Sequence, residues 1–308
     1  THVTETAHRT ILLVPHYYRP ENISSAAVAA RLLTAAGIGV RLLTLREDSP
    51  VDEDAVLRDL DHVQPGPDAA KDCELVLVLG GDGTFLRAAS FAHAQDIPVL
   101  GINLGHVGFL AEGESESLEA VIQHVIDKTY RVEERMTIDV MVRDADDNEL
   151  GRSWALNECS IENANRTQVL DATLEIDFRP VSSFGCDGVL ISTPTGSTAY
   201  AFSAGGPVMW PALDAILVVP NNAHALFAKP LVVSPRSTVA VESEPTTSDA
   251  VVVMDGFRSI AMPPGSRVEV IRGARPVRWV RIDDRPFTDR LVNKFQLPVS
   301  GWRGPRYS

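Results

Sequence analysis

The strongest constraint on the fold is an unbroken apolar run that leads directly into a glycine-rich turn. Residues 75–79 read LVLVL, and positions 80–83 that follow read Gly-Gly-Asp-Gly. Five consecutive apolar residues are typical of a strand that is buried on both faces, as in a parallel sheet. The stretch from Thr84 to Ala94 has helical character. The order strand, turn, helix therefore predicts a parallel sheet with crossover helices.

The same alternation of strands and helices extends over the first part of the chain. Short apolar runs predict strands, and alanine-rich or amphipathic stretches predict helices that cover the sheet. The polar segment from Arg46 to Ala70 is interpreted as a flap with at most a short helix. We predict an α/β domain over residues 1–133, with a Rossmann-like parallel sheet. Its other expected elements are strands at 11–14, 40–43 and 99–102, a helix at 24–36 capped by Ser24, and a helix at 117–127.

The pattern changes after about Glu133, where long helical periods give way to short β-rich runs separated by turns. We predict an all-β domain over residues 134–282. A C-terminal tail at 283–308, with a short amphipathic helix at 288–295, is expected to pack back on the first domain. The expected strands of this half are 136–143, 154–161, 172–178, 189–192, 215–219, 239–242, 251–254, 268–271 and 279–282.

Composition excludes several classes of protein. The 308 residues carry a net charge of −13, which argues against a nucleic-acid-binding protein, because such binding depends on clustered Lys and Arg. No apolar run approaches the roughly 18 residues of a membrane span, and the first residues lack the pattern of a secretory signal. The three cysteines are far apart and lack metal-ligand spacing. We therefore expect a cytoplasmic protein that binds neither membrane nor nucleic acid.

The turn at 80–83 is a candidate phosphate-binding site. Glycines let backbone N–H groups approach a ligand, and the N-terminus of the following helix favours an anion. The candidate phosphate-binding residues are Gly80, Gly81, Gly83 and Thr84. Any tight strand-to-helix turn can also use glycines for purely structural reasons.

Asp82 gives this turn a chemical character, because a carboxylate would repel phosphate unless it had a function of its own. It could accept a proton from an attacking hydroxyl group, or it could hold a cation. A Walker A loop is excluded because no Lys-Ser or Lys-Thr pair follows the glycines, and the dinucleotide-binding fingerprint carries no acid inside its turn.

A second polar block spans residues 185–207 and reads GCDGVLISTPTGSTAYAFSAGGP. An apolar strand leads into a loop with four hydroxyl side chains, and Tyr200 offers a flat ring on which a base could stack. A serine- and threonine-rich surface loop is the structural alternative, but such a loop would not need Asp187 or the glycines near its end. The adjacent pair Asn157 and Glu158 could bind a ribose diol or a carboxamide, although such pairs are usually solvated.

These two blocks carry a resemblance to a known family. The Gly80–Thr84 sequence resembles the motif shared by NAD kinases, diacylglycerol and sphingosine kinases and phosphofructokinases, in which the Asp accepts a proton from the attacking hydroxyl. The 185–207 block resembles the glycine-rich signature of NAD kinases. The residues at 103–110 and 220–226 also match blocks of that family. The chain departs from the family at Pro15–Pro20, after the first strand, and at Phe257, where some relatives carry Gln.

The resemblance implies an NAD kinase with Asp82 as proton acceptor. It would transfer the terminal phosphate of ATP or inorganic polyphosphate to the 2′-hydroxyl of the adenosine ribose of NAD, with a divalent cation, expected to be Mg²⁺, bound to the donor. No protein metal ligand is assigned, and a homo-oligomer, a dimer or a tetramer, is expected. A lipid kinase and a non-catalytic NAD-binding sensor are the alternatives. The implied NAD-binding residues are Asp82, Gly83, Arg87, Asn157, Glu158, Asp187, Thr198, Ala199, Tyr200, Ala201, Phe202 and Ser203.

Overall fold

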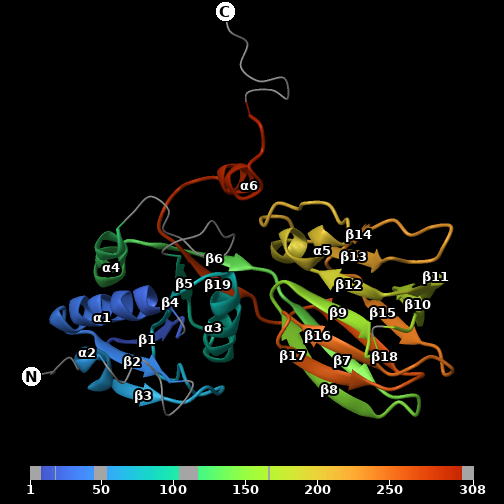
Figure 1. The fold of residues 1–308 in the computed structure, drawn as a ribbon, viewed down its shortest axis with the longest axis horizontal. Coiled ribbons are helices and arrows are strands. Elements are labelled where there is room, and N and C mark those ends of the chain that lie inside the picture. Colours follow the sequence, from blue (N-terminus) through green and yellow to red (C-terminus); the bar gives the residue numbers. More distant parts are fainter. Residues whose placement is uncertain (1–7, 18, 45–53, 104–116, 166, 300–308) are drawn as a thin grey trace, which may run out of the picture. The chain divides into compact units, whose positions relative to one another are not determined.

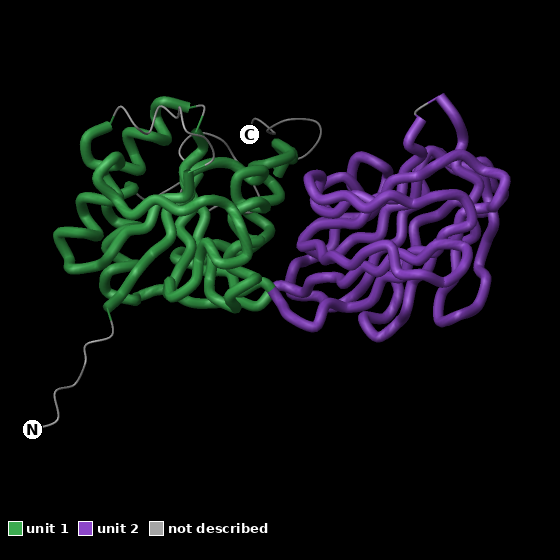
Figure 2. Tube along the Cα trace, turned by 90° about the horizontal axis from the view of Figure 1, so that it is seen from below, with its two compact units in different colours: residues 1–134, 277–308 green, residues 135–276 purple. Residues whose placement is uncertain are grey.

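The chain forms two compact units in a computed structural model that describes residues 8–17, 19–44, 54–103, 117–165 and 167–299 (Figure 2). Unit 1 comprises residues 1–134 and 277–308, and unit 2 comprises residues 135–276. No helix in the described ranges is long and apolar enough to cross a membrane. The three cysteines are buried and free.

Unit 1 contains a seven-stranded sheet with the strand order β3-β2-β1-β4-β5-β19-β6 (Figure 1). The strands from β3 through β19 in this order pair in parallel, and every residue of β4 is buried, as the apolar run predicts. The strands are β1 (Thr10–Pro15), β2 (Gly39–Leu43), β3 (Asp61–Val63), β4 (Leu75–Leu79), β5 (Val99–Ile102), β6 (Arg131–Arg135) and β19 (Val277–Arg281). The helices are α1 (Pro20–Ala35), α2 (Ala55–Arg58), α3 (Asp82–Gln95), α4 (Leu118–Asp127) and α6 (Phe287–Phe295).

The last strand of the chain joins this first sheet. The sequence pattern placed a strand at 279–282 in the second domain, but β19 pairs in parallel with β5, so the chain returns to unit 1 at Val277. Trp279 is almost completely buried and its ring lies 4.9 Å from that of Phe85 on α3. Because Trp279 and Phe85 are almost 200 positions apart, the local sequence pattern could not show that this strand belongs to the first sheet. The return of the C-terminal segment to the first domain is confirmed.

Two helices begin earlier than the sequence pattern predicts. Helix α1 starts at Pro20 rather than after Ser24, because a proline at the first helical position has a suitable φ and needs no hydrogen-bonded N–H. Helix α3 starts at Asp82 rather than Thr84, and Gly81 is its N-cap. Asp82 therefore lies in the first turn of a helix and not within the preceding loop.

Unit 2 consists of two six-stranded antiparallel sheets, which confirms the all-β prediction. Their strand orders are β11-β10-β15-β18-β7-β8 and β14-β13-β12-β9-β16-β17, and one apolar core draws residues from both sheets. The expected strand at 154–161 is divided in two by a turn at Leu156 and Asn157. The bounds are β7 (Ile138–Arg143), β8 (Glu149–Ala155), β9 (Glu158–Asn163), β10 (Leu170–Ile176), β11 (Arg179–Cys186), β12 (Gly188–Ser192), β13 (Ile216–Asn221), β14 (Leu231–Val233), β15 (Val239–Ser243), β16 (Ala250–Met254), β17 (Arg258–Met262) and β18 (Arg267–Arg272).

Candidate active site

The glycine-rich turn lies at the carboxyl end of β4, where the strand order of the first sheet reverses. From β1 the chain continues to β2, and from β4 it continues to β5 on the other side. Ligands of open α/β sheets bind at such a switch point, outside the carboxyl ends of the strands. The residue after β1, His16, donates its backbone N–H to Leu79 at 2.8 Å, so the two loops that flank the switch point are in contact.

The glycines of this turn are suited to their positions for two different structural reasons. A Cβ at Gly80 would lie 2.9 Å from the hydroxyl of Thr84, so the close packing of the turn requires glycine there. At Gly81 and Gly83 an added Cβ would meet no described atom within 4 Å. These two glycines therefore leave the backbone of the turn open to a ligand, at a helix N-terminus whose unpaired N–H groups favour an anion.

Asp82 is the first residue of α3 and is partly exposed. Arg87 lies on the same helix and is exposed. The first helical turn thus combines a carboxylate with backbone groups that suit phosphate oxygens.

A buried aspartate organises the turn that carries Asn157 and Glu158. The carboxylate of Asp255 accepts hydrogen bonds from the backbone N–H groups of Leu156 at 2.9 Å, Asn157 at 2.7 Å and Glu158 at 3.3 Å. Arg258 completes this arrangement with an ion pair to Asp255 at 2.8 Å. Sequence reasoning did not identify Asp255, which is about 100 residues away from the turn that it holds.

Phe257, where the chain departs from its resemblance to the family, takes part in the same arrangement. The guanidinium of Arg258 lies 4.8 Å from the centre of the Phe257 ring and 4.4 Å from that of Trp154. Such cation–π contacts are attractive and hold the guanidinium in place. Phe257 therefore supports the ion pair with Asp255.

The loop after β12 packs directly on the Asn157 turn. Thr193 donates its N–H to the carbonyl of Asn157 at 2.9 Å, and its hydroxyl donates to the carbonyl of Leu156. A Cβ at Gly196 would lie only 2.0 Å from the Asn157 carbonyl oxygen, so this contact requires glycine. Ser197 is completely buried and its hydroxyl accepts the N–H of Met209 at 2.8 Å. The hydroxyls of Thr193 and Ser197 therefore stabilise the loop through hydrogen bonds within the protein.

A 3₁₀-helix at Thr195–Thr198 and the short helix α5 at Tyr200–Ser203 follow this loop. The backbone N–H of Tyr200 lies near the carboxyl group of Glu158. This proximity brings together two of the sequence-predicted segments within unit 2.

Two buried acceptors of this region have no hydrogen-bond partner among the described residues, the Oδ1 of Asn157 and the Oε2 of Glu158. The two side chains are 6% and 8% exposed. Burial raises the pKa of Glu158 to about 8, and the nearby charge of Asp255 adds to this effect. An unsatisfied buried polar atom costs about 1–3 kcal/mol, so the Asn157 oxygen is suited to receive a donor from a ligand, and the Glu158 carboxyl group is suited to a hydrogen bond with a polar group of a ligand.

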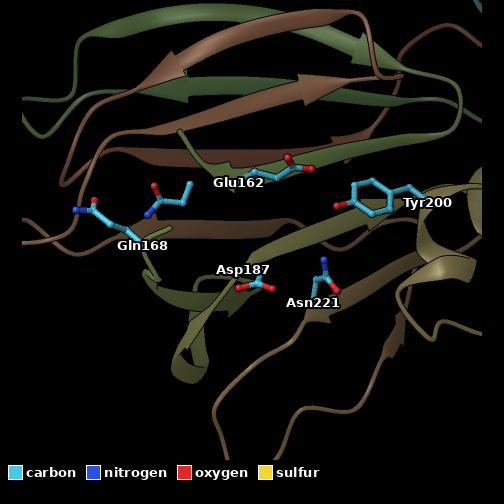
Figure 3. A pocket seen from close by; sticks show the side chains of 6 residues that line it. Glu162, Gln168, Asp187, Tyr200 and Asn221 are labelled. Atoms are coloured by element: carbon cyan, nitrogen blue, oxygen red, sulfur yellow. The ribbon is translucent and has the colours of Figure 1, made fainter. Parts of the chain in front are cut away.

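A cavity of about 390 Å³ lies in unit 2 beside Tyr200 and Asp187 (Figure 3). Its other lining residues, Glu162, Asn163, Gln168 and Asn221, were not identified from the sequence. The register explains their convergence, because Gly188 on β12 pairs with Glu162 on β9 and with Asn221 on β13. Only knowledge of these strand pairings could have revealed them. Asp187 also accepts a hydrogen bond from Asn222 at 2.8 Å.

Two of the predicted segments lie partly outside the described residues. The expected flap at 46–70 is one of them, and its described part contains α2 and β3. Of the matching block at 103–110, only Asn103 is described. No group of three His, Cys, Asp or Glu side chains in the described ranges could hold a metal ion.

The site residues predicted from the sequence fall into one group in each unit. Unit 1 holds Gly80, Gly81, Asp82, Gly83, Thr84 and Arg87, whereas unit 2 holds Asn157, Glu158, Asp187, Thr198, Ala199, Tyr200, Ala201, Phe202 and Ser203.

The sequence is similar to two families and to several curated proteins. Residues 20–130 match the family described as ATP-NAD kinase N-terminal domain, and residues 156–282 match ATP-NAD kinase C-terminal domain. The NAD kinase of Corynebacterium efficiens is 71% identical over 303 residues, which cover 98% of this chain and 95% of the relative. The NAD kinase of Corynebacterium diphtheriae is 66% identical over 298 residues, which cover 97% and 94%.

Two solved structures share the fold. A yeast NADH kinase complexed with NADH has a TM-score of 0.82 at 21% identity, over 96% of this chain and 90% of that chain. An NAD kinase from Archaeoglobus fulgidus in complex with ATP has a TM-score of 0.71 at 24% identity, over 94% and 100%. At these identities the likeness concerns the fold.

Proposed function

The chain belongs to the NAD kinase family, and we propose that it phosphorylates the 2′-hydroxyl of the adenosine ribose of NAD with Asp82 as proton acceptor. It is a phosphotransferase, and ATP is its proposed donor, with inorganic polyphosphate as a second candidate. The proposed residues come from both units. Asp82 and the turn at 80–84 act on the reacting groups, and the Asn157 region binds the dinucleotide.

The two unsatisfied acceptors of the Asn157 turn carry the dinucleotide part of this proposal. The Oδ1 of Asn157 and the Oε2 of Glu158 are adjacent in sequence and buried, and no described residue donates to either atom. The hydroxyls of a ribose and the amino groups of adenine and of a carboxamide are donors of the required kind. A bound NAD would offset the free energy that these two acceptors lose on burial.

Asp82 supplies the chemistry of the reaction. Its carboxylate accepts the proton of the 2′-hydroxyl as the ribose oxygen forms a bond to the terminal phosphorus and the bond to the leaving phosphate breaks. General base action of this kind typically accelerates a reaction by about 10²–10⁴-fold. The open backbone at Gly81 and Gly83, together with the N-terminus of α3, would bind donor phosphate oxygens. Arg87 would add a positive charge.

A divalent cation, Mg²⁺ in our proposal, would neutralise charge on the donor phosphates. Mg²⁺ in proteins is commonly bound through one or two carboxylates together with substrate phosphates and water. Because the described residues form no cluster of three metal-binding side chains, the donor would provide most of the ligands.

We further propose a cytoplasmic homo-oligomer, a dimer or a tetramer, with an interface on unit 2. Large apolar side chains near β14 are exposed, and Phe227 and Val232 have 52% and 56% of their surface accessible. Leu226, in the connection before β14, is fully exposed. Burying such side chains between subunits would stabilise an oligomer. Sedimentation velocity of the intact chain measures the state directly, and a monomer at micromolar concentration would refute this part.

The function is tested by measuring NADP formation from NAD with ATP or polyphosphate as donor, with and without Mg²⁺. We expect NADP with at least one donor, and loss of the product when the cation is chelated. Diacylglycerol in place of NAD should give no phosphorylated product. A phosphorylated lipid would instead support the lipid-kinase alternative. Binding of NAD without turnover on any donor would indicate the non-catalytic sensor and refute the proposal.

The joint action of the two units is tested by a crystal structure with NAD bound. The carboxylate of Asp82 should lie within hydrogen-bonding distance of the 2′-hydroxyl, while Asn157 and Glu158 contact the same molecule. An NAD molecule bound to unit 2 with its adenosine ribose far from Asp82 would refute the assigned mechanism.

A further inference from the structure

The cavity beside Tyr200 is distinctly acidic. Glu162 and Asp187 contribute carboxylates, whereas Asn163, Gln168 and Asn221 contribute amides, and none of the six lining residues is basic (Figure 3). Asn222 donates one hydrogen bond to Asp187, but an amide is neutral and adds no charge. The charges of the described lining residues therefore favour a cationic group and oppose a phosphate.

Tyr200 forms the aromatic wall of the cavity. Its hydroxyl lies near the side chains of Glu162 and Asn221, toward which it points in Figure 3. The three groups lie on different elements, α5, β9 and β13, so polar side chains flank the hydroxyl on two sides. An aromatic face attracts a cationic ring, and the neighbouring carboxylates add to that attraction.

The cavity is connected to the dinucleotide-binding residues through Tyr200. Its backbone N–H lies near the carboxyl group of Glu158, whose Oε2 is buried and has no hydrogen-bond partner among the described residues. The unsatisfied acceptor points independently to a polar ligand in this region. Tyr200 thus contributes its backbone to the Asn157–Glu158 group and its side chain to the cavity.

NAD carries one positively charged group, the nicotinamide ring, and only in the oxidised form. The adenine is neutral, the diphosphate is negative, and the ring of NADH is neutral. An acidic cavity with one aromatic wall therefore suits the oxidised ring, and the amides of Gln168 and Asn221 can pair with its carboxamide.

We propose that the Glu162–Asp187 cavity selects the oxidised over the reduced dinucleotide by attracting the charged nicotinamide ring. This inference rests on the proposed function and makes Glu162 and Asp187 specificity-determining residues. Each carboxylate is partly solvated, so each should change the preference only modestly, by roughly three- to tenfold, as expected for partly screened charge interactions. Because the discrimination is electrostatic, it should also weaken as salt concentration rises.

The test compares kcat/KM for NAD and for NADH in the wild type, Glu162→Gln, Asp187→Asn and the double variant. Both substitutions remove charge and keep the shape of the side chain. We expect the ratio of kcat/KM for NAD to that for NADH to fall by roughly three- to tenfold in each single variant, mainly through a higher KM for NAD. Glu244→Gln, an exposed carboxylate of unit 2 outside the cavity, is the matched control and should leave the ratio unchanged.

The affinities for NAD and NADH, measured by calorimetry on the same proteins, keep the inference separate from the proposed function. A wild type that forms neither NADP nor NADPH would refute the kinase, while the ratio of the two affinities would still decide the role of the cavity. If both carboxylate variants lose affinity equally for NAD and NADH, or lose none, charge selection is refuted. A ratio that falls only in the cavity variants supports it.

Discussion

The two groups of site residues are built in opposite ways. The glycine turn of unit 1 is a local structure, since Gly80 to Arg87 form one continuous strand-to-helix connection in which Asp82 and Thr84 are partly exposed. The dinucleotide group of unit 2 joins segments far apart in the chain. Asp255 holds the Asn157 turn, and the Thr193–Gly196 loop packs against that turn.

Because of this difference, substitutions in the two groups should affect different properties of the protein, the reaction rate or the stability of the fold. A partly exposed carboxylate at a helix N-terminus can be replaced with little effect on packing. In contrast, the polar groups around Asn157 are buried and mutually hydrogen-bonded, so removing one partner leaves others unsatisfied. We therefore expect substitutions in the turn to change the reaction rate and substitutions around Asn157 to change folding as well.

The largest expected effect is that of Asp82→Asn. Removing the proton acceptor should lower kcat by about 10²–10⁴-fold. Because Asp82 is partly exposed, the thermal unfolding midpoint should stay close to that of the wild type. Steady-state kinetics and circular dichroism melts measure the two quantities on one preparation. NADP formation at a near wild-type rate would contradict the role of Asp82.

Asp255→Ala should give the largest loss of stability. It removes the acceptor of three backbone N–H groups and leaves Arg258 without its buried partner. Breaking a buried ion pair from one side costs about 3–5 kcal/mol. Urea unfolding measures this loss, and Asp146→Ala, at an exposed turn of the same unit, should change stability by less than about 0.5 kcal/mol. Equal effects of the two variants would show that Asp255 does not organise the site.

Two glycine substitutions compare the regions directly. Gly196→Ala places a methyl group against the Asn157 carbonyl and should destabilise the protein by about 1–3 kcal/mol or more. At Gly81 the same substitution meets no described atom within 4 Å, so stability should change little. The added methyl should instead raise the KM for the donor. A Gly81→Ala protein with unchanged donor KM would argue against phosphate binding at this turn.

The smallest expected effect concerns pH. The pKa of Glu158 is raised by burial to about 8 in the folded protein, so the folded state holds a proton that the unfolded chain releases above its ordinary pKa of 4.5. The stabilisation that this proton provides is complete below pH 4.5, decreases as pH rises above 4.5 and is lost as pH rises through 8. Glu158→Gln should therefore gain stability relative to the wild type by about 1 kcal/mol between pH 6 and pH 7. Denaturant unfolding at both pH values measures the difference, and a pH-independent difference would contradict it.

Much of the fold could be predicted from local pattern. Strands β1, β2, β4 and β5 of the first sheet, the change to an all-β second unit and the helix at the C-terminus all appear in the sequence as periodicity and turn residues. Strands β3, β6, β11, β14 and β17 were missed. Short or exposed strands have weak apolar patterns, and their existence depends on pairing with a neighbour.

The sequence by itself determined where the carboxylate of Asp82 stands, because a strand, its glycine turn and the following helix are set by interactions within about twenty residues. It could not determine that Glu162 and Asn221 meet beside Tyr200, that Asp255 holds the Asn157 turn, or that Trp279 returns to the first sheet. Strand register and buried side-chain contacts decide these relations. Both depend on residues distant in sequence, so only the tertiary structure reveals them.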